Sequence, residues 1–205
     1  MNRYDLTTLV LGPVSTNCYL LTAQDSKEAY LIDPADDADL ILKVLKRTDC
    51  TRVSILLTHA HFDHVGAAQG IQKALGATVY LHPDDEDLLL GRIAGIPYVP
   101  PPAAYHLIKP SQTWMFSGSK ITCLPTPGHT PGSVCYRFDN VLFSGDTLFK
   151  DSIGRTDLPG GSPSAMQISL QKLLSIGEDC RIYPGHGEPT SLQQERNQNP
   201  YLMTT

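Results

Sequence analysis

The feature that most constrains this chain is a cluster of histidines directly after an apolar segment. Residues 58–64 have the sequence Thr-His-Ala-His-Phe-Asp-His and follow the apolar run 53–57. A continuous apolar run of this length is typical of a strand covered on both faces. Three histidines and an aspartate at the exit of a buried strand are hard to explain by packing. We interpret them as metal ligands rather than as an ordinary polar loop.

The spacing within the cluster favours two neighbouring metal ions. On a helix, residues two apart point in nearly opposite directions, so His59 and His61 could not share an ion there. On an extended segment they point to the same side. Asp63 and His64 follow at the expected turn into a helix, where they can point to a second place. The pattern therefore differs from a single helical zinc motif of the HExxH kind.

Two ions need further ligands, and three candidates lie farther along the chain. His129, Asp146 and His186 each follow an apolar strand and a glycine, namely Gly128, Gly145 and Gly185. Glycine at these places allows the backbone to turn tightly and to approach a crowded centre. Taken alone, each candidate would be an ordinary surface histidine or turn aspartate, and the shared glycine context is what singles them out.

The order of expected elements indicates an α/β fold with mixed sheets. Strands are expected over 5–11, 17–22, 29–32, 53–57, 78–83, 120–124, 134–138, 141–144 and 181–184. Helices are expected over 36–47, 65–75, 84–90, 165–176 and 191–199. Residues 91–110 are rich in glycine and proline and are expected to be a long loop, which at this length tends to be functional, or else a linker, and residues 151–161 are expected to be a glycine-rich loop. Of the remaining histidines, His82 is expected to be structural and His106 to be solvated.

Composition limits the class of protein and its partners. The 205 residues suit one domain spanning 1–205, and they contain no apolar run long enough to cross a membrane. The N-terminus lacks the order of a signal peptide, and the five cysteines are widely spaced without a CxxC pair. We therefore expect reduced thiols and a cytoplasmic protein. The net charge of −5 argues against a nucleic-acid partner.

Several motifs resemble those of one family. The segment 58–64 is similar to the HxHxDH signature of the metallo-β-lactamase superfamily, and the segments 33–34, 128–133, 144–147 and 185–187 resemble its other motifs in the same order. The resemblance covers nearly the whole chain. It implies the metallo-β-lactamase fold, a four-layer αβ/βα sandwich with metals at the edge where two sheets meet.

The resemblance also implies how the ligands are shared between two divalent ions. The first ion would be held by His59, His61 and His129. The second ion would be held by Asp63, His64 and His186, with Asp146 bridging both. Zinc is the default for nitrogen and oxygen ligands without cysteine, although iron and manganese suit the same ligands.

A site of this kind predicts a metal-dependent hydrolase. A bound metal lowers the pKa of water to about 7, so the metal-bound hydroxide would be the nucleophile, with Asp63 as the catalytic side chain beside it. Residues 128–130 and 152–159 look like the glyoxalase II-like branch, which hydrolyses thioesters such as S-lactoylglutathione. The chain lacks the long C-terminal helical domain that contributes glutathione contacts there and resembles the short, single-domain form. A small-molecule thioester is the expected substrate, and recognition of glutathione stays open.

Other functions fit parts of the same pattern. Residues 154–157 also resemble persulfide dioxygenases, which are mononuclear iron enzymes whose ligands would correspond to His59, His129 and Asp146. A non-catalytic metal-binding protein of the same fold is a further alternative. A β-lactamase is disfavoured by the absent signal peptide and a nuclease by the negative charge. Arg155 is a candidate substrate-binding residue, or it pairs with Asp157 and only braces its loop.

Overall fold

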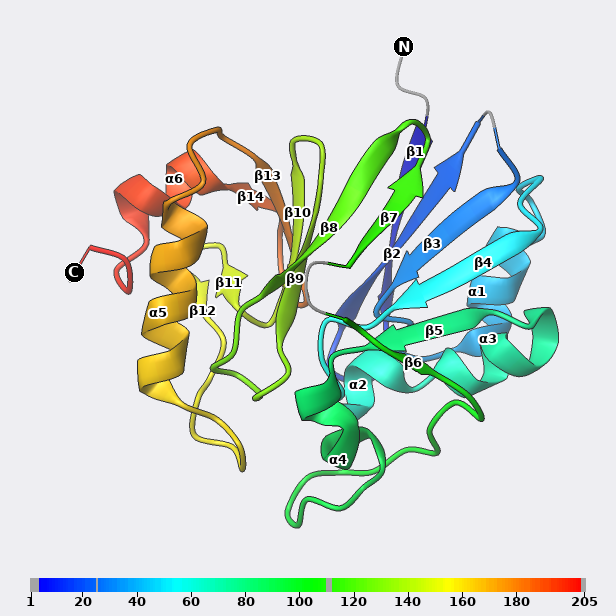
Figure 1. The fold of residues 1–205 in the computed structure, drawn as a ribbon, viewed down its shortest axis with the longest axis horizontal. Helices are drawn as coiled ribbons and strands as arrows, with labels where there is room; N and C mark the ends of the chain where they lie inside the picture. The colour runs from blue at the N-terminus through cyan, green and yellow to red at the C-terminus, as the bar shows by residue number, and fades with distance from the viewer. Residues whose placement is uncertain (1–3, 25, 110–111, 204–205) are drawn as a thin grey trace.

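The computed structural model describes residues 4–24, 26–109 and 112–203. Two six-stranded sheets lie face to face, and helices cover the outer face of each (Figure 1). The order of layers is helix, sheet, sheet, helix, so the predicted αβ/βα sandwich is confirmed. Among the described residues, no helix combines the length and the apolar character needed to cross a membrane.

The first sheet has the strand order β1-β2-β3-β4-β5-β6. Its first three strands are antiparallel, and β3, β4, β5 and β6 run parallel to one another. Parallel neighbours need crossover connections, which here carry the helices of the first half. The strands span Tyr4–Leu11, Thr16–Ala23, Glu28–Ile32, Arg52–Leu56, Thr78–Leu81 and His106–Leu107.

The second sheet has the strand order β14-β13-β10-β9-β8-β7. It is antiparallel except where β10 runs parallel to β13, and the predicted hairpin of β9 and β10 is present. A separate two-stranded hairpin, β11 and β12, follows β10 in the chain. The strands from β7 to β14 span Thr113–Phe116, Ser119–Pro125, Val134–Phe138, Val141–Gly145, Leu148–Phe149, Ser152–Ile153, Arg181–Pro184 and Thr190–Ser191.

Alternation along the strands separates three apolar layers. In β4, Ile55 packs towards the helices of the first half, whereas Leu56 packs between the sheets. In β10, Phe143 packs between the sheets and Leu142 packs towards the helices of the second half. Strands with both faces buried give continuous apolar runs, which explains the sequence around residue 55. The helices span Ala38–Leu45 (α1), Phe62–Val65 (α2), Ala68–Leu75 (α3), Glu86–Leu89 (α4), Pro163–Leu174 (α5) and Leu192–Gln198 (α6), with a 3₁₀ turn at Pro83–Asp85 (η1).

The prediction of one helix over 65–75 is wrong at its start, because the chain forms two helices there, α2 and α3. A β-carbon at Gly66 would overlap the carbonyl oxygen of Ala35, so only glycine lets the chain pass this point. The Ala67 N–H donates to the Pro34 carbonyl at 2.9 Å instead of bonding within a helix. The interruption separates α2, which carries Asp63 and His64, from the amphipathic α3.

The two expected loops contain short strands that the sequence does not predict. Residues 106–107 form β6, which pairs parallel with β5, and β12 lies within 151–161. Strand β7 was also not predicted. Pro110, which ends the first expected loop, lies outside the described residues. A two-residue strand is too short to show a periodic pattern in the sequence, so only its pairing with a neighbouring strand reveals it.

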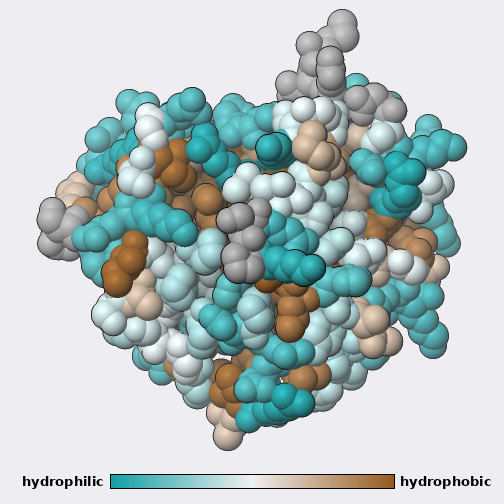
Figure 2. All heavy atoms as spheres, viewed as in Figure 1, coloured by the Kyte–Doolittle hydropathy of each residue, from teal (hydrophilic) through white to brown (hydrophobic). Residues whose placement is uncertain are grey.

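Hydrophilic residues predominate on the face shown in Figure 2, where the apolar patches are small and separated.

His106 is exposed on the edge strand β6, as predicted. His82 is half-buried and caps η1, because its Nδ1 accepts from the Asp84 N–H at 3.3 Å, and it does not approach the centre described below. All five cysteines lie within the described residues, and none forms a disulfide.

Candidate metal centre

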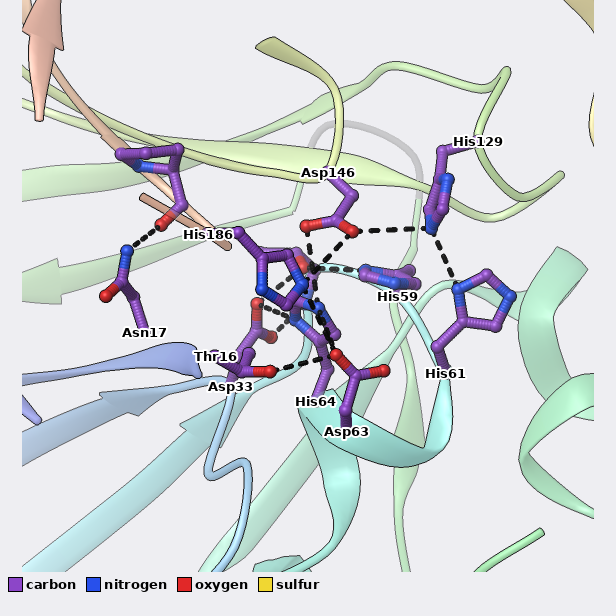
Figure 3. A network of polar contacts seen from close by, with 12 residues as sticks. Thr16, Asn17, Asp33, His59, His61, Asp63, His64, His129, Asp146 and His186 are labelled. Atoms are coloured by element: carbon purple, nitrogen blue, oxygen red, sulfur yellow. Dashed lines mark hydrogen bonds and ion pairs between the residues drawn. The ribbon is translucent and has the colours of Figure 1, made fainter. Parts of the chain in front are cut away.

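All seven predicted ligand side chains meet at one place, at the edge where the two sheets meet (Figure 3). His59 and His61 follow β4, and Asp63 and His64 lie in α2. The other three come from the second sheet, after β8, β10 and β13. The parallel neighbours β10 and β13 of the second sheet place the residues that follow them at the same edge, where the residues after β4 of the first sheet meet them.

The first group consists of His59, His61 and His129. One ring nitrogen from each lies within 4.8 Å of the others, and the three side chains are 1%, 5% and 3% exposed. His61 Nδ1 lies 2.8 Å from His129 Nε2. Three imidazole nitrogens converging in a buried space are the donor set that zinc and iron prefer.

The second group consists of Asp63, His64 and His186. Asp63 Oδ2 lies 3.5 Å from His64 Nε2 and 3.3 Å from His186 Nε2. The Thr16 hydroxyl donates to the same Asp63 oxygen at 2.9 Å. A third convergent set, His59, His64 and Asp146, takes one histidine from each group, so the two groups adjoin each other.

Asp146 lies between the two groups. Its Oδ2 is 3.5 Å from His129 Nε2 in the first group and 3.5 Å from His186 Nε2 in the second. Its Oδ1 is 3.5 Å from His64 Nε2. A single carboxylate that reaches both groups is suited to bridge two cations.

Hydrogen bonds fix the tautomers of the histidines so that bare nitrogens face the centre. His64 Nδ1 donates to Asp33 Oδ2 at 2.9 Å, and His129 Nδ1 donates to the Arg155 carbonyl at 2.8 Å. The Thr58 hydroxyl donates to Asp33 at 2.6 Å, so it accepts from His59 Nδ1 at 3.1 Å. When each of these rings is neutral, its proton sits on Nδ1 and Nε2 keeps its lone pair.

These inward-facing atoms have no other partner. His59 Nε2, His64 Nε2 and Asp146 Oδ1 are buried without a hydrogen-bond partner among the described residues, and His61 faces the centre with its Nδ1, the atom beside His129 Nε2. Buried polar atoms without partners are costly, and they occur together here because they face the same space. The donor set and its orientation thus fit a pair of divalent cations.

The histidines of the centre differ in the direction in which their surroundings shift their pKa values. Burial, reinforced by neighbouring histidines, lowers the pKa of His59 well below its ordinary value and lowers that of His61 to about 3. Burial alone would also lower the pKa of His64, but the carboxylates of Asp146, Asp33 and Asp63 raise it to about 9. At pH 7, His59 and His61 are neutral, whereas His64 carries a proton in the metal-free protein.

Metal binding at pH 7 is expected to release about one proton from His64, because a ligating histidine must be neutral. Calorimetric titration of zinc into apo-protein in two buffers of different ionisation enthalpy measures this release. His64→Ala is expected to lower the number of protons released and His61→Ala to leave it unchanged, and equal release from both variants would contradict the assignment.

The same group makes the stability of the metal-free protein depend on pH. Because the pKa of His64 in the folded protein exceeds 6.5, the charged His64 stabilises the metal-free protein below pH 6.5, and this stabilisation is lost as pH rises through about 9.

A cavity of about 320 Å³ opens onto the centre. Its wall is largely apolar and includes Val14, Phe62, Ile96, Pro97 and Leu158. Ile96 and Pro97 belong to the predicted 91–110 loop and Leu158 to the 151–161 loop, so both loops contribute to the cavity. Arg155 also lines it and makes a two-pronged ion pair with Asp157, with both nitrogen–oxygen distances at 2.7 Å.

Sequence reasoning missed the residues that support the ligands. Asp33 was noted as part of the 33–34 motif and was given no role, yet it is 1% exposed and orients both His59, through Thr58, and His64. Asn17 donates to the carbonyls of Pro184 and Gly187 at 2.9 Å each and so fixes the turn that carries His186. The one available signal was the position of Asp33 at the end of an apolar strand that precedes the histidine strand.

Comparison with known proteins agrees with the fold and the centre. Residues 11–186 match the family model described as the metallo-beta-lactamase superfamily. The chain is 36% identical to the probable metallo-hydrolase YqgX of Bacillus subtilis, with 94% of each chain covered. It is 32% identical to the hydroxyacylglutathione hydrolase GloC of Haemophilus influenzae, covering 91% of this chain and 92% of that one.

Solved structures agree in the same way. The BLEG-1 B3 metallo-beta-lactamase is 39% identical, with a TM-score of 0.86 and coverage of 97% of this chain and 99% of that one. TTHA1623 in a di-iron-bound form is 39% identical, with a TM-score of 0.84 and coverage of 96% and 100%. ETHE1 from Myxococcus xanthus is 26% identical, with a TM-score of 0.83 and coverage of 98% and 86%. The family match spans both sheets and every strand end that carries a ligand candidate, so this chain belongs to the metallo-β-lactamase superfamily of metal-dependent hydrolases.

Proposed function

We propose that this protein hydrolyses a small-molecule thioester, such as S-lactoylglutathione, with two divalent metal ions. The observation that carries the proposal is the pair of three-ligand groups that share Asp146. The relative named hydroxyacylglutathione hydrolase supports the choice of a thioester. The resemblance of residues 152–159 to the glyoxalase II-like branch supports the same choice.

In this proposal His59, His61 and His129 bind one ion, Asp63, His64 and His186 bind the other, and Asp146 binds both. Zinc suits this donor set, and the related di-iron-bound structure supports iron as a second possibility. When bound, such a pair of ions supplies an activated water molecule and polarises the carbonyl oxygen of the substrate.

Asp63 is the side chain proposed to orient the attacking water. Its carboxylate is 14% exposed and lines the cavity. Burial alone would raise the pKa of Asp63, but the hydrogen bond from His186 and the charge of His64 hold it below the usual range. A carboxylate with a low pKa is a weak base, so Asp63 is proposed to accept a hydrogen bond from the attacking water without becoming protonated itself.

The cavity is proposed to bind the acyl group, and Arg155 a negatively charged part of the thiol carrier. Arg155→Ala is expected to raise KM for S-lactoylglutathione about threefold to tenfold with little change in kcat, because only ground-state binding is lost. Thermal unfolding should not change, since the Arg155 side chain is 61% exposed. Steady-state kinetics check this result.

Asp157→Ala provides the matched control for Arg155. It frees the guanidinium from its ion pair and is expected to lower KM rather than raise it. If Arg155→Ala lowers the unfolding temperature and leaves KM unchanged, the pair only braces the loop.

A second candidate is a mononuclear iron persulfide dioxygenase that uses His59, His129 and Asp146. The resemblance of residues 154–157 to that group and the similarity to the ETHE1 structure favour it. Protein loaded with zinc or with iron distinguishes the two. Hydrolysis of S-lactoylglutathione supports the thioesterase, whereas oxygen uptake with glutathione persulfide would replace it. A protein that binds metal and converts neither compound would be a non-catalytic metal-binding protein.

Partners and location are part of the proposal. The net charge of −5 supports a small-molecule substrate rather than nucleic acid. Five widely spaced cysteines without a CxxC pair support a reducing compartment, and we propose a cytoplasmic location.

A further inference from the structure

A buried carboxylate lies behind the first histidine group. Asp85 ends the 3₁₀ turn after β5 and is 0% exposed. Its hydrogen-bond partners are two backbone N–H groups and one hydroxyl, all of them neutral. A carboxylate buried among neutral donors is expensive to desolvate, and it is retained where its hydrogen bonds position something.

The three donors to Asp85 come from the two segments that carry the first group. Asp85 Oδ2 accepts from the Ala60 N–H at 2.9 Å, and Ala60 lies between His59 and His61. The same oxygen accepts from the hydroxyl of Thr130, the residue after His129, at 2.8 Å. These segments follow β4 of the first sheet and β8 of the second, so one carboxylate joins the two halves of the fold.

Gly132 makes the close approach of the second segment possible. Asp85 Oδ1 accepts from the Gly132 N–H at 2.7 Å. A β-carbon at Gly132 would lie 2.6 Å from Asp85 N and 2.7 Å from Asp85 Oδ1. The Thr130 hydroxyl is held in turn by Ser133 Oγ at 2.7 Å. The 130–133 turn is therefore shaped around this carboxylate.

The second group depends on different supports. Asp33 holds His64, Thr16 holds Asp63, and Asn17 holds the turn that carries His186. The hydrogen bonds of Asp85 reach none of these residues. A change at Asp85 should thus affect one group and spare the other.

We propose that Asp85 is a positioning residue that sets the spacing between the His59–His61 segment and His129 and thereby controls the affinity of the first metal ion alone. This inference rests on the proposed two-metal centre. Residues that orient ligands typically change metal affinity about 10-fold to 100-fold when they are replaced.

Asp85→Asn tests the proposal, because it keeps the shape and turns one acceptor oxygen into an NH₂ group that cannot accept. Zinc is titrated into apo-protein in competition with a chromophoric chelator, which measures affinity without an activity assay. We expect one of the two dissociation constants to rise about 10-fold to 100-fold and the other to stay within twofold.

A double-mutant comparison assigns the affected ion. In a His186→Ala background, which weakens the second group, Asp85→Asn should further weaken binding of the remaining ion. In a His61→Ala background it should have no further effect. An equal effect in both backgrounds would overturn the proposal. Absence of zinc binding by the unmodified protein would instead refute the two-metal centre.

Glu195→Gln is the matched control. Glu195 is also 0% exposed and accepts three hydrogen bonds, from the Thr190 hydroxyl, the Asp151 N–H and Asn199 Nδ2. It should lower the unfolding temperature and leave zinc affinity unchanged. Asp85→Asn would have the same result if the carboxylate only stabilises the fold, and this would overturn the proposal.

If Asp85→Asn does not fold, Thr130→Val takes its place. It removes one donor to Asp85 and keeps the two backbone donors. The first ion should then bind several-fold more weakly, and unchanged affinity for both ions would contradict the proposal.

Discussion

Replacing Asp146 with alanine is expected to lower kcat/KM for thioester hydrolysis at least about a thousandfold, which is roughly 4 kcal/mol of transition-state stabilisation. The side chain lies 3.5 Å from ring nitrogens of both groups, so in the proposed centre its loss would remove a ligand from each ion and the link between them. Both zinc dissociation constants should therefore rise, which chelator competition would measure alongside the kinetics.

Asp146→Asn separates the charge from the shape. The amide keeps one oxygen but loses the charge that would offset two cations, so most of the activity should still be lost. If either variant keeps normal hydrolysis and normal affinity for both ions, Asp146 does not bridge them.

Gly185→Ala is expected to have the second largest effect. A β-carbon at this position would overlap Asp146 Oδ1 and lie 2.8 Å from His64 Cε1. The methyl group would displace both side chains from the centre, with zinc affinity falling about 10-fold to 100-fold. The strain should also lower the free energy of unfolding by about 1–3 kcal/mol. Chelator competition and denaturant unfolding measure the two effects.

Two other glycines show what alanine does where no side chain of the centre lies close to the added β-carbon. At Gly177 no atom lies within 4 Å of an added β-carbon, so alanine should change neither property. Gly187 is also open but has a φ of +76°, so alanine there should cost about 1 kcal/mol of stability without displacing Asp146. If Gly185→Ala behaves like Gly187→Ala, the close approach at residue 185 is not needed for the centre.

The layers of the fold could be predicted because the apolar runs are long and their positions alternate clearly. Ile55 and Leu56 face opposite layers of the core, and both must be apolar whichever way the strand turns. The break at Gly66 could not be predicted, because it depends on the Ala35 carbonyl, some thirty residues earlier in the chain. Local periodicity carries no information about such an approach.

In the candidate centre, too, part could be predicted from the sequence and part could not. Its seven side chains stand out because histidine and aspartate recur at strand ends beside glycine. Asp33 gave little signal, since its role depends on the pairing of Ile32 with Leu56 in neighbouring strands, which places it beside Thr58. Asp85 gave none, because its partners Ala60 and Gly132 come from opposite sheets. Support for the ligands is thus a property of the register of the strands and of the meeting of the two halves.

The central claim is that seven side chains bind two metal ions and that hydrolysis needs both ions. It is tested most directly by titrating zinc into apo-protein while following the hydrolysis of S-lactoylglutathione. The seven-ligand centre predicts that activity rises until about two ions are bound per chain and then stays constant. Full hydrolysis with one ion bound, or no hydrolysis with two, would contradict it.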